Sequence, residues 1–189
     1  MRFTLRKALA AFAVSGLLLS SCTPELLYDK NIPNFTAPAD KALCVVIRQS
    51  SFGGKYAPLW LDAKLVSGTS GATITSFEVP PGPHLVITKI NIKTKTKLNF
   101  QAGKIYYLQQ AVWPVPFVGL MTGLTQMPQS EAAPLIEKER GSIRYSRINP
   151  DNDDKDLSNE DFQDETKDYD KWAQKEPAKA KAEADYPGY

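Results

Sequence analysis

The sequence predicts a mainly β protein: a small antiparallel β-sandwich, followed by one short helix and a disordered tail. Between residues 42 and 113, six or seven short segments rich in β-branched and aromatic residues alternate with turn-forming residues. This spacing is typical of sandwiches. No connection between the segments contains a helical crossover of the kind that usually joins parallel strands, so we expect antiparallel pairing.

The first predicted strand, ALCVVIRQ (42–49), is apolar at successive positions, and we expect both of its faces to be buried. Residues 51–55 (SFGGK) form a predicted loop. Residues 57–66 predict two short strands joined by a tight turn at Asp62-Ala63, and SGTSG (67–71) predicts a second loop.

The next strands alternate apolar and polar residues or carry β-branched and aromatic residues, and are predicted at 73–79, 85–92, 93–100 and 105–113. Pro81-Gly82 fits the central positions of a type II turn, because proline presets φ and glycine accepts positive φ. Residues 102–104 (AGK) predict a hairpin turn.

The segment PVPFVGLMTGL (114–124) is apolar but broken by two prolines and two glycines. We expect a buried connection, because large exposed apolar patches are uncommon without a partner. The alternative is an exposed loop that touches lipid or another protein, with Trp113 and Phe117 as the candidate interface residues. A short helix is predicted at 131–140, with Ser130 as its N-cap, followed by an extended segment at 141–148.

Residues 149–189 are predicted to be a disordered acidic tail with at most transient helix around 156–182. From residue 151 onward the chain has 13 acidic residues against six lysines, whereas residues 22–150 have 14 basic residues against eight acidic ones. Such a tail has too few apolar residues to offset the conformational entropy lost on folding. The folded domain is thus expected to span 41–148.

The N-terminus predicts a cleaved secretory signal peptide over residues 1–21. It begins with basic residues and continues with an apolar run, 8–19, that is too short to span a bilayer. Leu19-Ser20-Ser21-Cys22 resembles the bacterial lipobox. The resemblance implies cleavage between Ser21 and Cys22 and acylation of Cys22, and several acyl chains would make the anchor stable. The alternative is an ordinary signal peptide with a chance cysteine, or a short membrane helix.

The residue after the anchor, Thr23, is not the aspartate that resembles an inner-membrane retention signal in enteric-type bacteria. This favours the outer membrane, with the protein facing the periplasm. Residues 22–40 contain three prolines and predict a tether, part of which could dock as an edge segment. If lipid occupies Cys22, the remaining Cys44 has no intramolecular partner, and we expect it to be a buried thiol.

Lys93, Lys95 and Lys97 alternate along one strand and therefore share a face. They are the candidate anion-binding residues, for an anionic envelope polymer or for the acidic tail of the chain itself. The alternative is a solvated face that discourages aggregation at an edge. The expected partners are the membrane, through the anchor, and another envelope protein or polymer, with no nucleic acid because the chain is exported.

We expect no enzyme activity, metal site or cofactor. His84 is the only histidine, and no nucleophile or phosphate-binding motif accompanies it. The leading hypothesis is therefore a lipid-anchored β-sandwich that binds or scaffolds at the envelope. The alternative is an enzyme or enzyme accessory acting on envelope carbohydrate, which requires two converging carboxylates. The available acids in the body include Asp62, Glu78, Glu131, Glu137 and Glu139.

Four motifs between residues 42 and 138 resemble a bacterial lipoprotein family called domain of unknown function 2846. They are Phe-Gly-Gly at 52–54, Leu-Asp-x-Lys-x-Val at 61–66, Val-Pro-Pro-Gly-x-His at 79–84 and Gly-Lys-x-Tyr-Tyr-Leu at 103–108. Ala63 departs from the glycine usual in that family, and so does the long acidic tail. The resemblance implies an immunoglobulin-like or transthyretin-like sandwich without an established activity. The same features are similar to PEGA-type surface modules.

Overall fold

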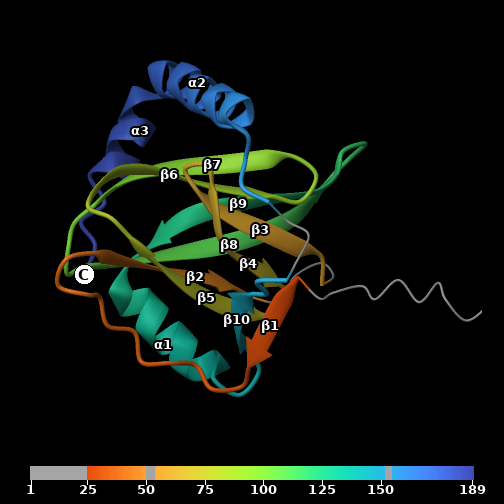
Figure 1. Ribbon diagram of the computed structural model, residues 1–189, viewed down its shortest axis with the longest axis vertical. Coiled ribbons are helices and arrows are strands. Elements are labelled where there is room, and N and C mark those ends of the chain that lie inside the picture. Colours follow the sequence, from red (N-terminus) through yellow and green to blue (C-terminus); the bar gives the residue numbers. More distant parts are fainter. Residues whose placement is uncertain (1–24, 50–53, 152–154) are drawn as a thin grey trace, which may run out of the picture.

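Two β-sheets and three helices make up the protein in the computed structural model, which describes residues 25–49, 54–151 and 155–189 (Figure 1). The six-stranded sheet has the order β1 (Leu26–Asp29), β10 (Arg144–Ile148), β5 (Thr73–Val79), β2 (Ala42–Arg48), β8 (Ile105–Val115) and β9 (Gly119–Met127). The four-stranded sheet has the order β4 (Lys64–Ser70), β3 (Tyr56–Leu61), β6 (Gly82–Lys89) and β7 (Lys93–Phe100). The helices are α1 (Gln129–Glu139), α2 (Asn159–Lys175) and α3 (Pro177–Ala184).

Strand β2 lies at the centre of the structure, and every one of its residues is buried, as the sequence predicts. Its two faces contribute to two different cores. Cys44 and Val46 join the core between the sheets, together with residues of β3, β6, β7 and β8. Leu43, Val45 and Ile47 face the other way, and the core on that side includes residues of α1. An apolar strand without alternation is therefore stable here because both of its faces are covered.

A polar layer joins the two sheets beside this core. Arg48 is completely buried, and its Nη1 donates to the backbone oxygen of Lys55 at 2.8 Å. Gln110 of β8 donates from Nε2 to Thr88 Oγ1 at 2.9 Å and accepts from the hydroxyl of Thr69. Because buried polar groups are costly without partners, these bonds fix how β4, β6 and β8 face one another.

The expectation of a purely antiparallel structure is wrong for the larger sheet. Strand β2 pairs with β8 in parallel, as does β10 with β5, whereas all pairs in the four-stranded sheet are antiparallel. The chain between β2 and β8 forms β5 and the entire second sheet, so this long connection needs no helix. Crossover length was therefore a poor guide to strand direction here.

Residues 114–124 form a hairpin rather than a buried connection. Strand β9 pairs antiparallel with β8 and forms an edge of the sheet. The pairing runs from Tyr107, opposite Met127, to Val115, opposite Gly119. Two prolines and the first glycine of the segment lie at or near the turn of this hairpin, where they interrupt no central strand. Likewise, residues 67–70 of the predicted loop 67–71 belong to β4.

Helix α1 confirms the predicted helix near 131–140, although it begins earlier than expected. Its N-cap is Pro128, whose backbone oxygen accepts from the amides of Glu131 and Ala132 at 2.9 Å each. Ser130 lies inside the first turn. The predicted extended segment that follows contains β10.

Part of the predicted tether is docked. Strand β1 pairs antiparallel with β10, with Leu26 opposite Ile148 and Asp29 opposite Tyr145. Ile32 is buried in the core that includes residues of α1. The alternative that part of the tether docks as an edge segment therefore applies to Leu26–Asp29.

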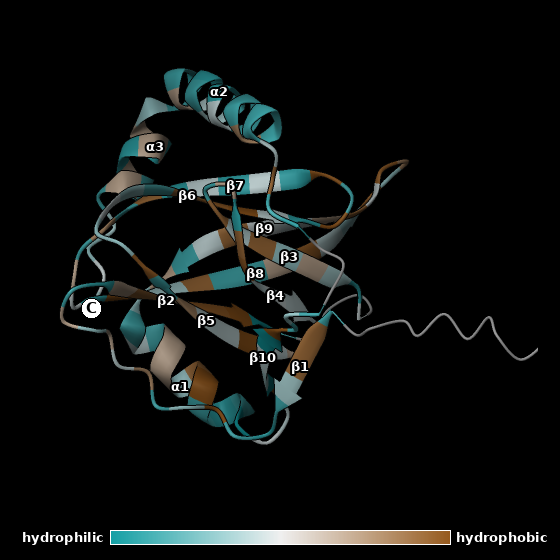
Figure 2. Cartoon of the chain, in the orientation of Figure 1, coloured by the Kyte–Doolittle hydropathy of each residue, from teal (hydrophilic) through white to brown (hydrophobic). Residues whose placement is uncertain are grey.

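The predicted disorder of residues 149–189 is wrong for the described part of this tail. It forms α2 and α3, and its last residues reach β8, where the amide of Tyr189 donates to the backbone oxygen of Ile105 at 2.8 Å. Figure 2 shows that the residues of α2 are mostly hydrophilic. The tail's composition is polar because only one side of α2 is in contact with the sheet. Among the described helices, none combines the length and apolar character needed to cross a membrane.

Replacing Gln110 tests the polar layer between the sheets. Gln110→Ala removes the hydrogen bonds that Gln110 makes to the buried hydroxyls of Thr69 and Thr88, so we expect the free energy of unfolding to fall by about 1–3 kcal/mol. Urea denaturation measures this change. Ala111→Ser, at an exposed neighbouring position of β8, is the control and is expected to change it by less than about 0.5 kcal/mol. Equal stability of Gln110→Ala and the wild-type protein would show that the layer contributes nothing.

Candidate functional site

The outer face of the four-stranded sheet carries an apolar centre beside a row of lysines. The register of β6 and β7 sets Leu85 opposite Lys97 and Ile87 opposite Lys95, while Trp60 of β3 lies opposite Ile87. Because paired residues point to the same face, the three apolar side chains and the predicted lysine row share this surface.

Helix α2 lies over this face (Figure 1). Its Tyr169 is buried together with Trp60, Leu85 and Ile87. Other apolar residues of this segment pack against the same cluster: Leu157, Phe162, Trp172 and Ala173. Positions 162, 169 and 173 follow the spacing of one helix face. These few apolar side chains therefore all point to the sheet and can hold α2 against it.

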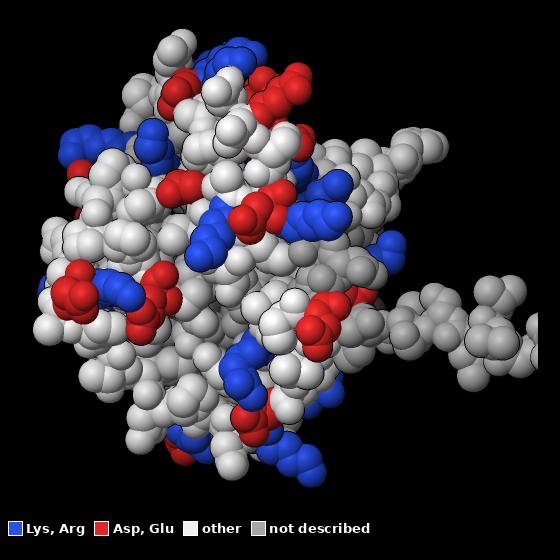
Figure 3. All heavy atoms as spheres, in the orientation of Figure 1, with Lys and Arg blue, Asp and Glu red and all other residues white. Residues whose placement is uncertain are grey.

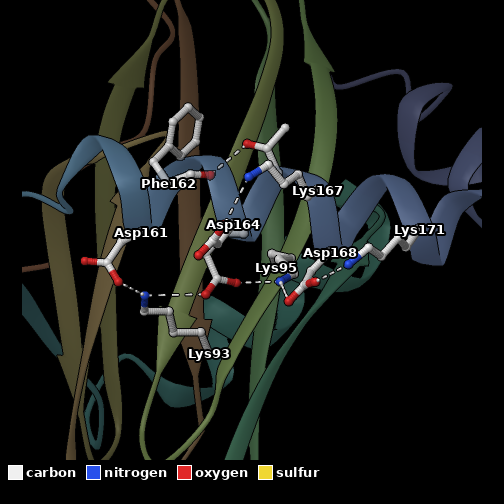
Figure 4. Close-up of polar contacts among 10 residues, drawn as sticks. Lys93, Lys95, Asp161, Phe162, Asp164, Lys167, Asp168 and Lys171 are labelled. Atoms are coloured by element: carbon white, nitrogen blue, oxygen red, sulfur yellow. Dashed lines mark hydrogen bonds and ion pairs between the residues drawn. The ribbon is translucent and has the colours of Figure 1, made fainter.

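The acids of α2 meet the lysines of β7 in order along the strand (Figure 4). Lys93 Nζ lies 3.3 Å from Asp161 Oδ1 and 3.4 Å from Glu165 Oε1. Lys95 donates to Glu165 Oε2. Further along, Lys95 Nζ lies 3.9 Å from Asp168 Oδ2, and Lys97 Nζ lies 3.9 Å from an oxygen of Asp170. Figure 3 shows basic and acidic side chains interleaved on the face of the molecule that is in view.

The Lys95–Glu165 pair is the most shielded of these contacts, since the two side chains are only 16% and 14% exposed. Exposed ion pairs contribute little to stability, whereas breaking a partly buried pair leaves a charge without compensation. This pair therefore determines the register of α2 on β7 more strongly than the other charges do.

The start of α2 combines a cap with the first ion pair. The hydroxyl of Ser158 accepts from the Asp161 amide at 3.0 Å and donates to Asp161 Oδ2 at 2.7 Å. The hydrogen bond from Ser158, followed by the hydrogen bond and charge of Lys93, lowers the pKa of Asp161 below its ordinary value. Both interactions favour the ionised carboxylate at the positive end of the helix.

Backbone contacts tie the approach to α2 onto the sheet. Trp60 Nε1 donates to the backbone oxygen of Lys155 at 3.0 Å, and the Leu65 amide donates to Asp156 Oδ1 at 2.8 Å. The Leu157 amide donates to the backbone oxygen of Ala63 at 2.7 Å. The tail thus engages the β3–β4 hairpin before the helix starts.

Glu183 of α3 closes the far end of this interface. Its Oε2 accepts from the Lys97 amide at 3.1 Å and from the Tyr169 hydroxyl at 2.9 Å. Burial, and next the bond to Glu183, raise the pKa of Tyr169. Beyond α3, the hydroxyl of Tyr186 donates to the backbone oxygen of Met127, which joins the tail to β9 as well.

A cavity of about 180 Å³ remains between α2 and the sheet, with Leu85, Phe162 and Tyr169 among its lining residues. Asp62 also lines it, and Asp62 Oδ2 is 2.8 Å from His84 Nδ1 while Oδ1 accepts from the Leu85 amide at 3.0 Å. His84 therefore contacts the β3–β4 turn, where Asp62 has a φ of 54°.

The body acids named for the carbohydrate alternative lie in three separate places, with Glu131, Glu137 and Glu139 all on α1. Asp62 lines the cavity beneath α2, Glu137 lines one beside α1, and Glu78 pairs with Lys41 at 2.7 Å. Within the described residues, no three His, Cys, Asp or Glu side chains are grouped to hold a metal ion.

The candidate interface residues Trp113 and Phe117 are exposed, so the expectation of burial for this segment is wrong. Trp113 is 40% exposed and Phe117 is fully exposed at the turn of the β8–β9 hairpin. The lipidation and cleavage residues, Cys22 and Ser21, lie outside the described residues. Cys44 is buried as expected, and burial raises the pKa of its thiol.

Comparison with protein-family models finds no matching family, and searches of curated proteins and of solved structures find no significant match.

The sequence reasoning identified the lysines of this interface but missed α2, which covers them. Two signals were present. Ser158 followed three residues later by Asp161 has the form of a helix start, and Phe162, Tyr169 and Ala173 have helical spacing. The high overall charge of the tail obscured both signals.

Removing the shielded carboxylate tests how α2 is held. Glu165→Ala leaves Lys95 partly buried without its partner, and we expect amide exchange in residues 159–175 to accelerate about tenfold or more. Hydrogen exchange followed by mass spectrometry measures this rate. Gln163→Ala, at an exposed position of α2, is the matched control. Equal rates in the two variants would contradict a role for the pair.

Acid provides a second test, through Asp161. Because its pKa is lower in the folded state, its contribution to stability is fully present above the ordinary value of 3.8 and is lost as the pH falls through the lowered value. We expect the side-chain resonances of Asp161 to shift mainly below about pH 4 in an NMR titration. In Asp161→Asn this component is expected to be missing. An identical titration in the variant would assign the transition to other groups.

Proposed function

We propose that this protein is a lipid-anchored, non-catalytic module that binds or scaffolds on the periplasmic face of the outer membrane. The observation that carries the proposal is the sequence Leu19-Ser20-Ser21-Cys22 at the end of a basic and then apolar leader. Acyl chains on Cys22 would hold the mature chain at a bilayer surface, and Thr23 favours the outer membrane.

The position of β1 supports a short attachment. Glu25 lies three positions after Cys22, and its backbone oxygen accepts from the Asn149 amide at 3.0 Å. Three residues reach at most about 10 Å. An anchor on Cys22 would therefore hold the folded body close to the bilayer, rather than at the end of a long flexible tether.

We propose an immunoglobulin-like or transthyretin-like sandwich of the kind that domain of unknown function 2846 implies. Support comes from the apolar core between the two sheets and from the positions of the shared motifs. Asp62 lies in the β3–β4 turn, Pro81 precedes Gly82 at the start of β6, and Tyr106 lies in the core. In this proposal the motifs stabilise turns and the core.

The lysine row is the proposed site for an anionic partner of the binding module. Lys93, Lys95 and Lys97 already contact acids of α2 and α3, so such a partner would compete with the chain's own tail. The tail then limits binding to ligands that carry several negative charges at a comparable spacing.

The N-terminus of the native protein tests the proposal directly. We expect mass spectrometry of protein purified from membranes to show Cys22 as the first residue, carrying acyl chains. Cys22→Ser is the control and is expected to keep its leader and to lack any acyl mass. An unprocessed leader in the wild-type protein, or a Cys22 terminus without acyl mass, would contradict the proposal.

A further inference from the structure

The turn of the β8–β9 hairpin presents a group of apolar side chains to the outside. Phe117 is fully exposed at a φ of 65°, and Trp113 and Val118 are 40% and 38% exposed. The pairing of the two strands continues to Val115–Gly119, immediately below the turn. The exposed aromatic residue is therefore held in place by regular strand pairing.

The β6–β7 turn extends this group. Asn91 Nδ2 donates to the backbone oxygen of Val118 at 2.6 Å, which joins the two turns, and Ile92 is 45% exposed. Gly119 has a φ of 95°, and a Cβ atom there would lie 2.3 Å from Asn91 Nδ2. A side chain at this position would thus disrupt the junction. We call Ile92, Trp113, Phe117 and Val118 the apolar tip.

The charged residues that lie nearest the apolar tip in the sequence are lysines, of which Lys93 is paired with Asp161 and Glu165 of α2. The sequence has no charged residue between Lys104 and Glu131, and the β6–β7 turn is bounded by Lys89 and Lys93. Lys89 is exposed. Tryptophan and phenylalanine beside lysine suit the boundary between acyl chains and anionic head groups.

The apolar tip and the beginning of the described chain lie on one side of the molecule in the view of Figure 1. In Figure 1 the turn of the β8–β9 hairpin and the start of β1 are both at the right-hand side. Hydrogen bonds of the polar layer join the middle of β8 to β10: Gln110 bonds to Thr69 of β4, and the neighbouring Gly68 accepts from Ser146 of β10, the strand beside β1.

We propose that the apolar tip inserts into the phospholipid bilayer beside the lipid anchor, so that the protein touches the membrane at two points. This inference rests on the proposed lipid anchoring, which places that end of the molecule within reach of a bilayer. Two contacts would fix the orientation of the body, and α2 and the lysine row would then have a defined position relative to the membrane.

The shape of the apolar tip favours a bilayer over a protein partner. It is a narrow projection, whereas a stable protein interface buries about 800 Å² on each partner. Pro114 and Pro116 have no amide hydrogen, which leaves fewer donors for an added strand. A fluid bilayer needs neither a broad complementary surface nor strand pairing.

A label next to Phe117 tests the insertion. Val118→Cys in the full chain, purified from membranes, is labelled with an environment-sensitive fluorophore and reconstituted into vesicles of phosphatidylethanolamine and phosphatidylglycerol. Because Cys44 is buried, it does not compete for the label. We expect a blue shift and quenching by lipids with a spin label on the acyl chain. Ala102→Cys, exposed in the turn before β8 at the opposite end of that strand, is the matched control and is expected to show neither.

Adding Phe117→Asp to the Val118→Cys protein is expected to lower the ratio of immersed to free label by about tenfold or more, since a charged group replaces the ring that is proposed to insert into the lipid. Equal quenching at positions 118 and 102 would overturn the proposal. So would a blue shift that appears without lipid and grows with protein concentration, because it would assign the apolar tip to a second copy of the chain.

The mass of the N-terminal peptide, measured on the same sample, reports lipidation separately. If that mass shows no acyl group, the measurement is repeated with Cys22→Ser, which removes the thiol that would otherwise take up the label. Quenching at position 118 that persists would refute the anchor and retain the apolar tip.

Discussion

The apolar centre of the outer face of the four-stranded sheet must be covered, and most of the unexpected structure follows from this constraint. Trp60, Leu85 and Ile87 would together expose a large apolar patch, which is rare in a folded domain. The segment from Lys155 to Lys175 covers them with Tyr169 and its apolar neighbours. Its acids simultaneously neutralise the lysines along β7.

This arrangement makes the tail part of the domain at both of its ends. Leu157 is bonded to the β3–β4 hairpin, and Tyr189 is bonded to the first residue of β8. At the other terminus, β1 pairs with β10 and occupies that edge of the larger sheet. The two ends of the described chain therefore add to the stability of the sheets, and a short link from β1 to an anchor on Cys22 would restrict how the body can turn.

The lysine row then has a structural role that any ligand must overcome. An anionic polymer would have to replace the Glu165 contact, which is shielded from water, as well as the more exposed contacts of Asp168 and Asp170. Exposed ion pairs are weak, so competition is expected to begin at these outer positions. In this account the apolar tip has a different proposed purpose, which is to orient the body, although its Ile92 directly precedes Lys93 of the lysine row.

The sequence was sufficient to predict the elements whose pattern is local. The unbroken apolar run of β2, the turn at Asp62 and the alternation of Lys93, Lys95 and Lys97 all have their origin in neighbouring residues. Strand direction could not be predicted in the same way, because the parallel pairing of β2 with β8 depends on where the intervening sheet lies. Residues 114–124 were misinterpreted because prolines and glycines mark a hairpin turn as readily as an irregular connection.

The prediction of disorder for the tail was wrong for a different reason. Mean composition predicts disorder when apolar residues are few, yet helix docking requires only one face, and Phe162, Tyr169 and Ala173 supply it. Their partner surface comes from strands about 70 to 110 positions earlier, so no local window contains both sides. The lysines of the candidate site could be predicted from the sequence. The acids that pair with them could not, because that required recognising α2.

Solution NMR of the full chain tests the covering of the sheet most directly. The account predicts nuclear Overhauser contacts between the Tyr169 ring and the methyl groups of Leu85 and Ile87, with backbone order in residues 159–175 equal to that of β6. The absence of these contacts, with α2 amides as mobile as those of an unfolded chain, would contradict it.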